Sequence, residues 1–400
     1  MRIGVLTYYK VKNFGANLQA VSTYCYLQNN GHCPVFINYF SKELYKAYKN
    51  GLDDPQWNEH INFVNSIIKN QTEICFSADD VYNEAQRLNI EAIIVGSDAL
   101  LQHHPLISRI KKAKRRIIYI EKATSDRLFP NVFWGCGIAN RIPMALMSVS
   151  SQDSAFDKFL PSTKRKMLAT LSRMRMITVR DTWTRDMVKS IINREVKITP
   201  DPVFAFNQNA GGIVPSKESI IKKYSLPERY VLLSMFYQAL TEDCIYNLKK
   251  GLNELGISLV ILPMPEGINF KHSADYVINL PLPTIEWYAL IKYSCGYIGN
   301  NMHPIVTCLH NAVPCFSIDN WGRTNFWGHQ IGGSSKVKHI LDTFNVGDNH
   351  RMVERFKCNV TADEIINALV NFPVEDIKKY AIGYLDLYNA MMTSIINSLR

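Results

Sequence analysis

Strand-like and helix-like segments alternate along this 400-residue chain from its first residue. Short apolar runs separated by longer amphipathic stretches are typical of βαβ units, which build parallel sheets covered by helices. We therefore expect an α/β fold. A first series of strands is predicted at residues 1–7, 35–39, 92–95, 144–149 and 176–179, ending at 198–202, and a second series at residues 230–234, 258–262, 296–298 and 313–318.

The two series predict two domains, because a chain of this length exceeds one ordinary core. The polar stretch 207–219 follows two prolines and is interpreted as a linker. An amphipathic helix is expected at residues 374–399. The predicted organisation is an N-terminal Rossmann-like domain (1–206) and a C-terminal Rossmann-like domain (207–375) facing a cleft. A final helix (376–400) is expected to pack back on the N-terminal domain.

Composition favours a globular protein with an anionic partner. A net charge of +10 and a pI near 9.0 suit a nucleic acid, an anionic small substrate or an anionic membrane surface. No nucleic-acid motif accompanies the charge, so we predict no nucleic-acid partner. No apolar run reaches the roughly 18 to 20 residues of a membrane span, and the N-terminus reads as a strand, not as a signal peptide.

The cysteines predict a reducing compartment. There are nine, an odd number, and none forms a CxxC pair. They are expected to be reduced thiols of a cytoplasmic protein. No His, Asp or Cys cluster has metal-ligand spacing, so we predict neither a metal nor a cofactor.

The first candidate segment, residues 7–20, runs from a strand through a glycine-containing turn into a helix. Asn13, Gly15 and Ala16 are placed at the helix N-terminus, where free N–H groups favour an anion or a sugar oxygen. The segment is not GxGxxG, so a dinucleotide is not indicated. The alternative is an ordinary helix-entry turn.

Two further strands end in polar residues. Gly96, Ser97 and Asp98 follow the strand at 92–95, and Arg180 follows the strand at 176–179. Asp98 could accept a proton from a sugar hydroxyl or could cap a helix. Arg180 could grip a carboxylate or phosphate, or form a surface pair with the neighbouring Asp181.

Residues 109–116 contain six basic side chains in eight positions. Such a run is usually a solvated helix face. The alternative is a patch that binds an anionic membrane surface or a pyrophosphate. The apolar residues 117–120 that follow are compatible with membrane contact.

A histidine stands beyond a later strand tip. Residues 297–299 are followed by Asn300, Asn301 and His303, and an apolar helix pattern begins just beyond. Ligands of parallel sheets collect at this edge, and a histidine titrating near neutral pH could act there as acid, base or anion partner. The alternative is a satisfied polar residue that caps a core helix.

Together these segments resemble the polysaccharide pyruvyl transferase family. The resemblance runs in order from residue 3 to about residue 325. The segments that match the family pattern are Asn13-Phe14-Gly15-Ala16-Asn17-Leu18-Gln19, Val95-Gly96-Ser97-Asp98, Thr178-Val179-Arg180-Asp181, Asp201-Pro202 and Asn301-Met302-His303. The chain departs from the family pattern at Pro304, at Ser150 and at Ala99, and it has no arginine two residues before His303.

The resemblance implies a GT-B-like fold and a transferase that moves the pyruvyl unit of phosphoenolpyruvate to a sugar, forming a ketal. It implies an acceptor on the N-terminal side and phosphoenolpyruvate on the C-terminal side. The predicted acceptor is a lipid-linked precursor of a capsule or exopolysaccharide in a bacterial cell. The protein is then expected in the cytoplasm, peripherally at the inner face of the membrane, with contact through residues 109–116.

The resemblance also assigns roles. It implies that His303 is the general acid, that Arg180 binds the phosphoenolpyruvate anion, and that Asp98 is a base or acceptor ligand. Arg323 is expected to share the anion with Arg180. The remaining substrate-binding candidates are Asn13, Gly15, Ala16, Gln19, Gly96, Ser97, Asn300 and Asn301.

Two other functions stay open. A GT-B nucleotide-sugar glycosyltransferase is the first, since fold alone does not fix chemistry. Against it, Glu286 and Asp319 are the only carboxylates between residues 281 and 330. The second is a non-catalytic glycan-binding relative, in which the departures from the family pattern at Pro304 and Ser150 would have abolished turnover.

Overall fold

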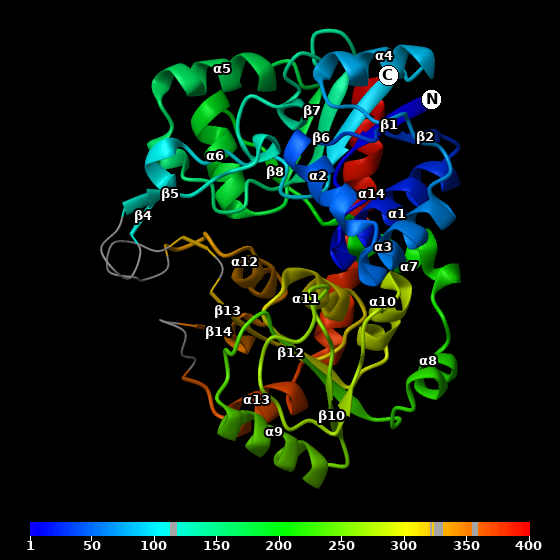
Figure 1. Ribbon diagram of the computed structural model, residues 1–400, viewed down its shortest axis with the longest axis vertical. Coiled ribbons are helices and arrows are strands. Elements are labelled where there is room, and N and C mark those ends of the chain that lie inside the picture. Colours follow the sequence, from blue (N-terminus) through cyan, green and yellow to red (C-terminus); the bar gives the residue numbers. More distant parts are fainter. Residues whose placement is uncertain (113–117, 321, 324–330, 354–358) are drawn as a thin grey trace.

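The computed structural model describes residues 1–112, 118–320, 322–323, 331–353 and 359–400 (Figure 1). Its two large sheets have six strands each, all paired in parallel. The first has the order β2–β1–β3–β6–β7–β8, made of β1 (Arg2–Leu6), β2 (Cys33–Phe36), β3 (Ala92–Gly96), β6 (Met144–Val149), β7 (Met176–Val179) and β8 (Lys197–Ile198). The second has the order β11–β10–β9–β12–β13–β14, made of β9 (Tyr230–Ser234), β10 (Ser258–Ile261), β11 (Tyr276–Val277), β12 (Gly296–Gly299), β13 (Cys315–Asp319) and β14 (His350–Met352).

Helices cover both faces of the sheets, which explains why the central strands are apolar throughout. The first unit holds α1 (Phe14–Asn29), α2 (Lys42–Gly51), α3 (Pro55–Ile67), α4 (Ala78–Arg87), α5 (Pro161–Leu171) and α6 (Thr182–Ile192). The second holds α8 (Lys217–Tyr224), α9 (Glu242–Glu254), α10 (Thr284–Lys292), α11 (Met302–His310), α12 (Lys336–Thr343) and α13 (Ala362–Val370). The predicted α/β fold is confirmed.

The last helix, α14 (Val374–Leu399), joins the two units. It leaves the second unit beside α11 and runs along β6 and β7 of the first sheet (Figure 1). Tyr388, Met391 and Ile395 of this helix are buried in a core that continues through both units. The boundaries at 206/207 and 375/376 stay predictions.

A second connection between the two units is the contact of α1 and α3 with α10. The Phe14 ring stacks on Trp287 of α10, with centroids 4.9 Å apart. Gln56 of α3 donates to the Leu282 carbonyl (2.9 Å) and accepts from the Leu282 amide (2.6 Å). Because these polar groups are buried and mutually satisfied, they fix how α1 and α3 meet the second unit.

The predicted linker at 207–219 does lie between the two sheets, but it is ordered. The chain there forms α7 (Phe206–Ala210) and a 3-10 turn (Gly211–Ile213), and α8 then starts at Lys217. Its polar side chains bond several neighbouring elements, with Asn207 bonded to Tyr288 of α10 and Gln208 to Asn389 of α14. The Asn209 amide, for example, donates to the hydroxyl (3.0 Å) and carbonyl (3.2 Å) of Ser22.

At residues 109–112, the described part of the basic run, the helix-face interpretation is wrong. Leu106–Arg109 is a short 3-10 helix, η1, and β4 (Ile110–Lys112) pairs antiparallel with β5 (Ile118–Ile120). β-branched isoleucines at both strands favour this hairpin over a helix. Residues 113–117, which include three of the basic residues of the run, lie outside the described part of the chain.

Two searches of the described residues found nothing. No helix among them is long and apolar enough to cross a membrane. No group of three or more His, Cys, Asp or Glu side chains in these ranges is arranged to hold a metal ion.

Candidate functional site

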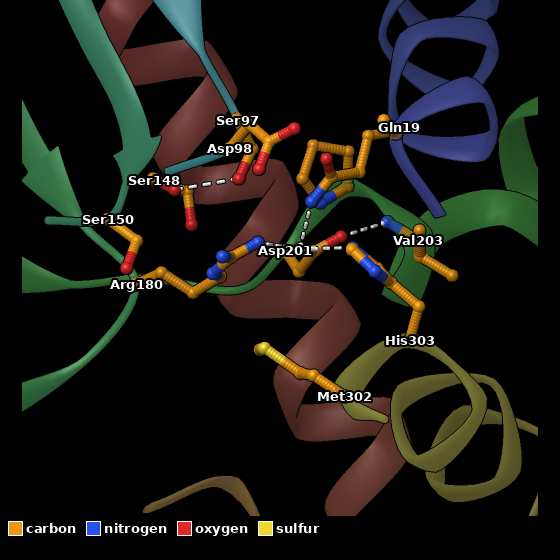
Figure 2. Close-up of polar contacts among 12 residues, drawn as sticks. Gln19, Ser97, Asp98, Ser148, Ser150, Arg180, Asp201, Val203, Met302 and His303 are labelled. Carbon is orange, nitrogen blue, oxygen red and sulfur yellow. Dashed lines mark hydrogen bonds and ion pairs between the residues drawn. The ribbon is translucent and has the colours of Figure 1, made fainter. Parts of the chain in front are cut away.

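Polar side chains from both units converge where strands of the first sheet end. Asp98 follows β3, Arg180 follows β7, and Asp201 comes three residues after β8. The carboxyl ends of parallel strands share one edge of a sheet, so these three side chains meet there. His303, in the first turn of α11, reaches this edge from the second unit (Figure 2). The structure therefore brings together the three residues predicted to be catalytic.

Asp201 is the centre of the cluster. Its Oδ2 accepts from Arg180 Nη1 (2.7 Å) and from Gln19 Nε2, and its Oδ1 accepts from the Val203 amide (2.9 Å) (Figure 2). Burial opposes a charge at this carboxyl, yet Arg180, His303 and the hydrogen bonds outweigh it and keep the pKa of Asp201 below its ordinary value. Arg180 and Asp201 thus form a buried ion pair.

This pair corrects two expectations about Arg180 and Gln19. Arg180 bonds the distant Asp201, whereas Asp181 caps α6 by accepting from the Thr184 amide (2.7 Å), so the alternative of a surface Arg–Asp pair is wrong. Gln19 is 1% exposed and donates to Asp201, which makes it a positioning residue in this structure. Among the described residues no partner reaches Arg180 Nε.

His303 lies against the ion pair without completing a hydrogen bond. Its Nε2 is 3.9 Å from Asp201 Oδ2, too far for a hydrogen bond, and no other residue of the described ranges bonds it. The alternative of a fully satisfied helix-capping residue is therefore wrong. Asn301, not His303, is the N-cap of α11.

Burial lowers the pKa of His303 to about 4; Asp201 opposes this shift and Arg180 adds to it. The imidazole is then neutral at pH 7. The expectation that His303 titrates near neutral pH does not hold in this structure, because a desolvated cation is costly next to an arginine.

Gly15 explains how the histidine fits. A Cβ on Gly15 would lie 2.0 Å from His303 Cγ and 2.1 Å from its Nδ1. The first turn of α1 thus needs a residue without a side chain, because the imidazole from the other unit occupies that space. Asn13 caps the same helix by accepting from the Ala16 amide (3.1 Å), as predicted for a helix N-terminus.

A small cavity borders this contact. It has a volume of about 40 Å³, room for about one water molecule. Asn13, Gly15, Asn301 and His303 all line it, so residues from opposite ends of the predicted motif series share one space. Pro304, a departure from the family pattern, lines it too.

Lys336 is a functional candidate that the sequence did not reveal. It is the first residue of α12, after the N-cap Ser335. Burial and the nearby Arg180 lower its pKa, while Asp98, Asp181 and Asp153 oppose the shift. A lysine after a serine is an ordinary helix start, so only the fold shows that it faces Asp98 and Arg180.

Asp98 and the two residues before it lie at the end of β3. No helix follows Asp98, and its Oδ1 accepts from the Ala99 amide (2.6 Å), so the helix-cap alternative is wrong. The Ser97 hydroxyl donates to the Ser148 carbonyl (2.7 Å). Gly96 has φ +128°, and a Cβ there would be 2.1 Å from the Met147 carbonyl oxygen. Gly96 and Ser97 therefore hold the strand end that carries Asp98.

Asn300 and Arg323 also have structural partners. Asn300 Oδ1 accepts from the Phe236 amide (3.2 Å). The Arg323 guanidinium pairs with Asp157 and lies 5.8 Å from the Trp183 ring centroid. No contact joins Arg323 to Arg180 within the described ranges, so the structure does not bring these two predicted anion ligands together; Lys336 is the cation that lies near Arg180.

Solved structures share this architecture. The UDP-GlcNAc 2-epimerase from Neisseria meningitidis has a TM-score of 0.55 at 10% identity, over 99% of this chain and 100% of that one. A putative UDP-N-acetylglucosamine 2-epimerase from Listeria monocytogenes has 0.51 at 8%, over 98% and 94%. A glycosyltransferase from Streptomyces nogalater has 0.48 at 10%, over 100% and 97%. At these identities the likeness concerns the fold alone. The two structures with TM-scores above 0.5 confirm the predicted GT-B-like fold.

Sequence comparison identifies the family. No curated protein is significantly similar to this chain. The family model of the polysaccharide pyruvyl transferases matches residues 13–322, well over half of the 400 residues. The match spans Asn13, Asp98, Arg180, Asp201 and His303, the residues that meet at the edge of the first sheet. The chain therefore belongs to the polysaccharide pyruvyl transferase family.

Proposed function

We propose that the protein transfers the pyruvyl unit of phosphoenolpyruvate to a sugar of a lipid-linked capsule or exopolysaccharide precursor, forming a pyruvate ketal. The observation that carries the proposal is the buried His303 Nε2, which faces the Arg180–Asp201 pair without a hydrogen-bond partner among the described residues. A buried, unpartnered imidazole nitrogen is costly unless a ligand uses it. The reaction takes place at the cytoplasmic face of the membrane, without a metal or cofactor.

The reaction begins with a proton. His303 donates it to the methylene carbon of the enol, which becomes a methyl group and leaves an oxocarbenium-like centre at the adjacent carbon. A sugar hydroxyl adds to that centre and loses its proton to a base, for which Asp98 is the candidate. The bond from this carbon to the phosphate oxygen then breaks, and a second hydroxyl of the same sugar closes the ketal and gives its proton to the departing phosphate.

A general acid at pH 7 must be protonated, which His303 by itself is not. The donor supplies the missing stabilisation, because its phosphate and carboxylate bring negative charge to the imidazole and raise its pKa. Arg180 is held by Asp201, so the pair contributes little net charge. We assign Lys336 and the N-terminus of α11 to the donor anion.

The lining of the small cavity must move for this reaction. A space of about 40 Å³ beside His303 does not hold a three-carbon phosphate ester. Donor binding is therefore expected to widen the cavity by moving Gly15 and His303 away from other lining residues such as Phe236 and Met264. Gly15 and His303 carry the contact between α1 and α11, which belong to different units.

One experiment in deuterated water tests donor, chemistry and acceptor together. The protein is incubated with phosphoenolpyruvate and lipid-linked glycans, and products are analysed for released phosphate and for the mass and NMR spectrum of the glycan. Pyruvyl transfer predicts equimolar phosphate and a ketal whose methyl group carries one deuterium. Turnover of nucleotide sugars without phosphoenolpyruvate would instead indicate a glycosyltransferase.

His303→Ala separates an enzyme from a glycan-binding relative. The variant is expected to bind phosphoenolpyruvate but to lose ketal formation. His32→Ala is the matched control, because His32 precedes β2 and so lies at the opposite edge of the first sheet. Glycan binding by the wild type without any turnover would contradict the proposed transfer.

A further inference from the structure

One segment of the surface concentrates exposed apolar side chains. Between residues 106 and 120, six large ones have exposed fractions from 49% to 71%. No other stretch of similar length in the described ranges exposes more than three. We call five of these residues the hairpin surface: Leu106, Ile107, Ile110, Ile118 and Ile120. Tyr119 is left out because the strand register places it on the opposite face. An apolar cluster of this kind marks a contact with another molecule.

The hairpin geometry shows why the cluster is uncovered. Ile110 pairs with Ile120 across the antiparallel ladder, and Lys112 pairs with Ile118. Directly opposite residues share a face, and alternate residues return to it, so Ile110, Ile118 and Ile120 lie on one side. The hairpin stands at the edge of the molecule, away from both large sheets (Figure 1). A two-stranded ribbon gains stability when such a face is buried.

The charge beside the hairpin surface identifies the chemistry of the partner. A cavity of about 530 Å³ adjoins it and is lined in part by Ile107 and Ile110. Five cationic side chains line the same cavity against two carboxylates, Glu121 and Asp153, and one of the five, Arg323, is paired with Asp157. The cations are Arg109, Lys122, Arg127, Lys158 and Arg323. Apolar side chains next to excess positive charge match the interface of a bilayer that carries anionic headgroups.

We infer that the hairpin surface docks the protein on an anionic lipid bilayer. The apolar side chains enter the boundary between headgroups and acyl chains, and the cations around the cavity face the headgroups. A second copy of the chain is a poorer occupant, because pairing two such surfaces brings two sets of excess cations together. The docking goes beyond the proposed transfer and requires neither donor nor acceptor, although it would hold the protein where a lipid-linked glycan is presented.

Vesicle flotation of the full chain tests the inference. Wild type is expected to float with vesicles of phosphatidylglycerol and phosphatidylcholine, and much less with phosphatidylcholine alone. The variant Ile107→Ser/Ile118→Ser/Ile120→Ser should lose at least about tenfold in partitioning onto the anionic vesicles. The matched control is Ile213→Ser/Val370→Ser/Ile382→Ser, which removes three exposed aliphatic side chains outside the hairpin surface. Their exposed fractions are 42%, 62% and 63%, and this variant should float like wild type.

Other outcomes would overturn the inference. If the hairpin variant and the control float equally, the hairpin surface does not bind the membrane. The same conclusion follows if the wild type does not float with the vesicles. A wild-type dimer that the hairpin variant converts to a monomer, with flotation unchanged, would assign the surface to self-association. Far-UV circular dichroism of each variant excludes misfolding. Since no substrate is present, failure here leaves the transfer reaction standing, and failure of the transfer leaves flotation unchanged.

Discussion

Replacing Gly15 by alanine should separate folding from catalysis. In the wild type the His303 imidazole occupies the space where a side chain at position 15 would begin. Alanine is the smallest residue that fills this space. The change adds one methyl group, leaves every polar contact of the site in place and acts only through the position of the ring.

The structure sets the size of the disturbance. A Cβ at position 15 would lie 2.0 Å from His303 Cγ, and ordinary van der Waals contact begins at 3.4 Å. The root of the ring must therefore move by roughly 1.4 Å, the difference between these distances. A misplacement of about 1 Å at a reacting group can cost about 100-fold in rate, so we expect a loss of that order in ketal formation. Helix propensity favours alanine over glycine by up to about 1 kcal/mol, which offsets part of the steric cost to stability.

The assay compares kcat for phosphate release with unfolding by urea. Gly212→Ala is the matched control, because a Cβ there meets nothing within 4 Å. We expect full activity from the control, whereas Gly15→Ala loses about 100-fold in rate and little stability. Activity within about threefold of wild type in a folded Gly15→Ala protein would refute the reasoning, since the position of His303 would then not matter for the rate.

Four further predictions concern the charges of the site. Asp201→Asn should destabilise the protein by about 3–5 kcal/mol in urea unfolding, because it leaves a buried arginine unpaired, whereas the exposed Asp186→Asn should cost at most about 1 kcal/mol. Lys336→Gln should weaken phosphoenolpyruvate binding by at least about tenfold in calorimetry, and Lys338→Gln on the same helix should not. His303 has a pKa of about 4 and is therefore neutral in the free protein at pH 7.5, a pH at which the donor phosphate, with a pKa of about 6, is already ionised. If the bound donor raises the pKa of His303, the wild-type protein should take up a proton when it binds phosphoenolpyruvate, and His303→Gln should not. The same low pKa predicts that stability falls as the pH drops from 6.5 towards 4, since the unfolded chain binds the proton that the folded chain excludes, and urea unfolding of His303→Gln should show a weaker fall.

Much of the architecture followed from local pattern. Apolar runs such as 92–95 and 144–149 were long enough and regular enough to predict the strands β3 and β6. Because parallel strands place their carboxyl ends at one edge, Asp98 and Arg180 could be predicted at the same edge of the first sheet. His303 follows a strand of the other sheet, and only the family resemblance linked it to them. Pattern did not predict the order of residues 207–219, where polar side chains bond distant elements, as Asn209 bonds Ser22 of α1.

The roles of the site residues depended on distances that the sequence does not contain. Nothing in the order of residues places Gln19 and Arg180 on the same carboxylate, or an imidazole 288 positions away in the space of a glycine Cβ. The pKa of His303 was expected near neutrality because the residue type allows it, and burial beside Arg180 lowers it to about 4. Desolvation is a property of the packed interior, so only the tertiary structure decided it. The sequence by itself thus determined the two parallel sheets and the residues at their strand ends. Packing between the two units decided that His303 meets the edge of the first sheet, and which of the residues there are paired, charged or left for a ligand.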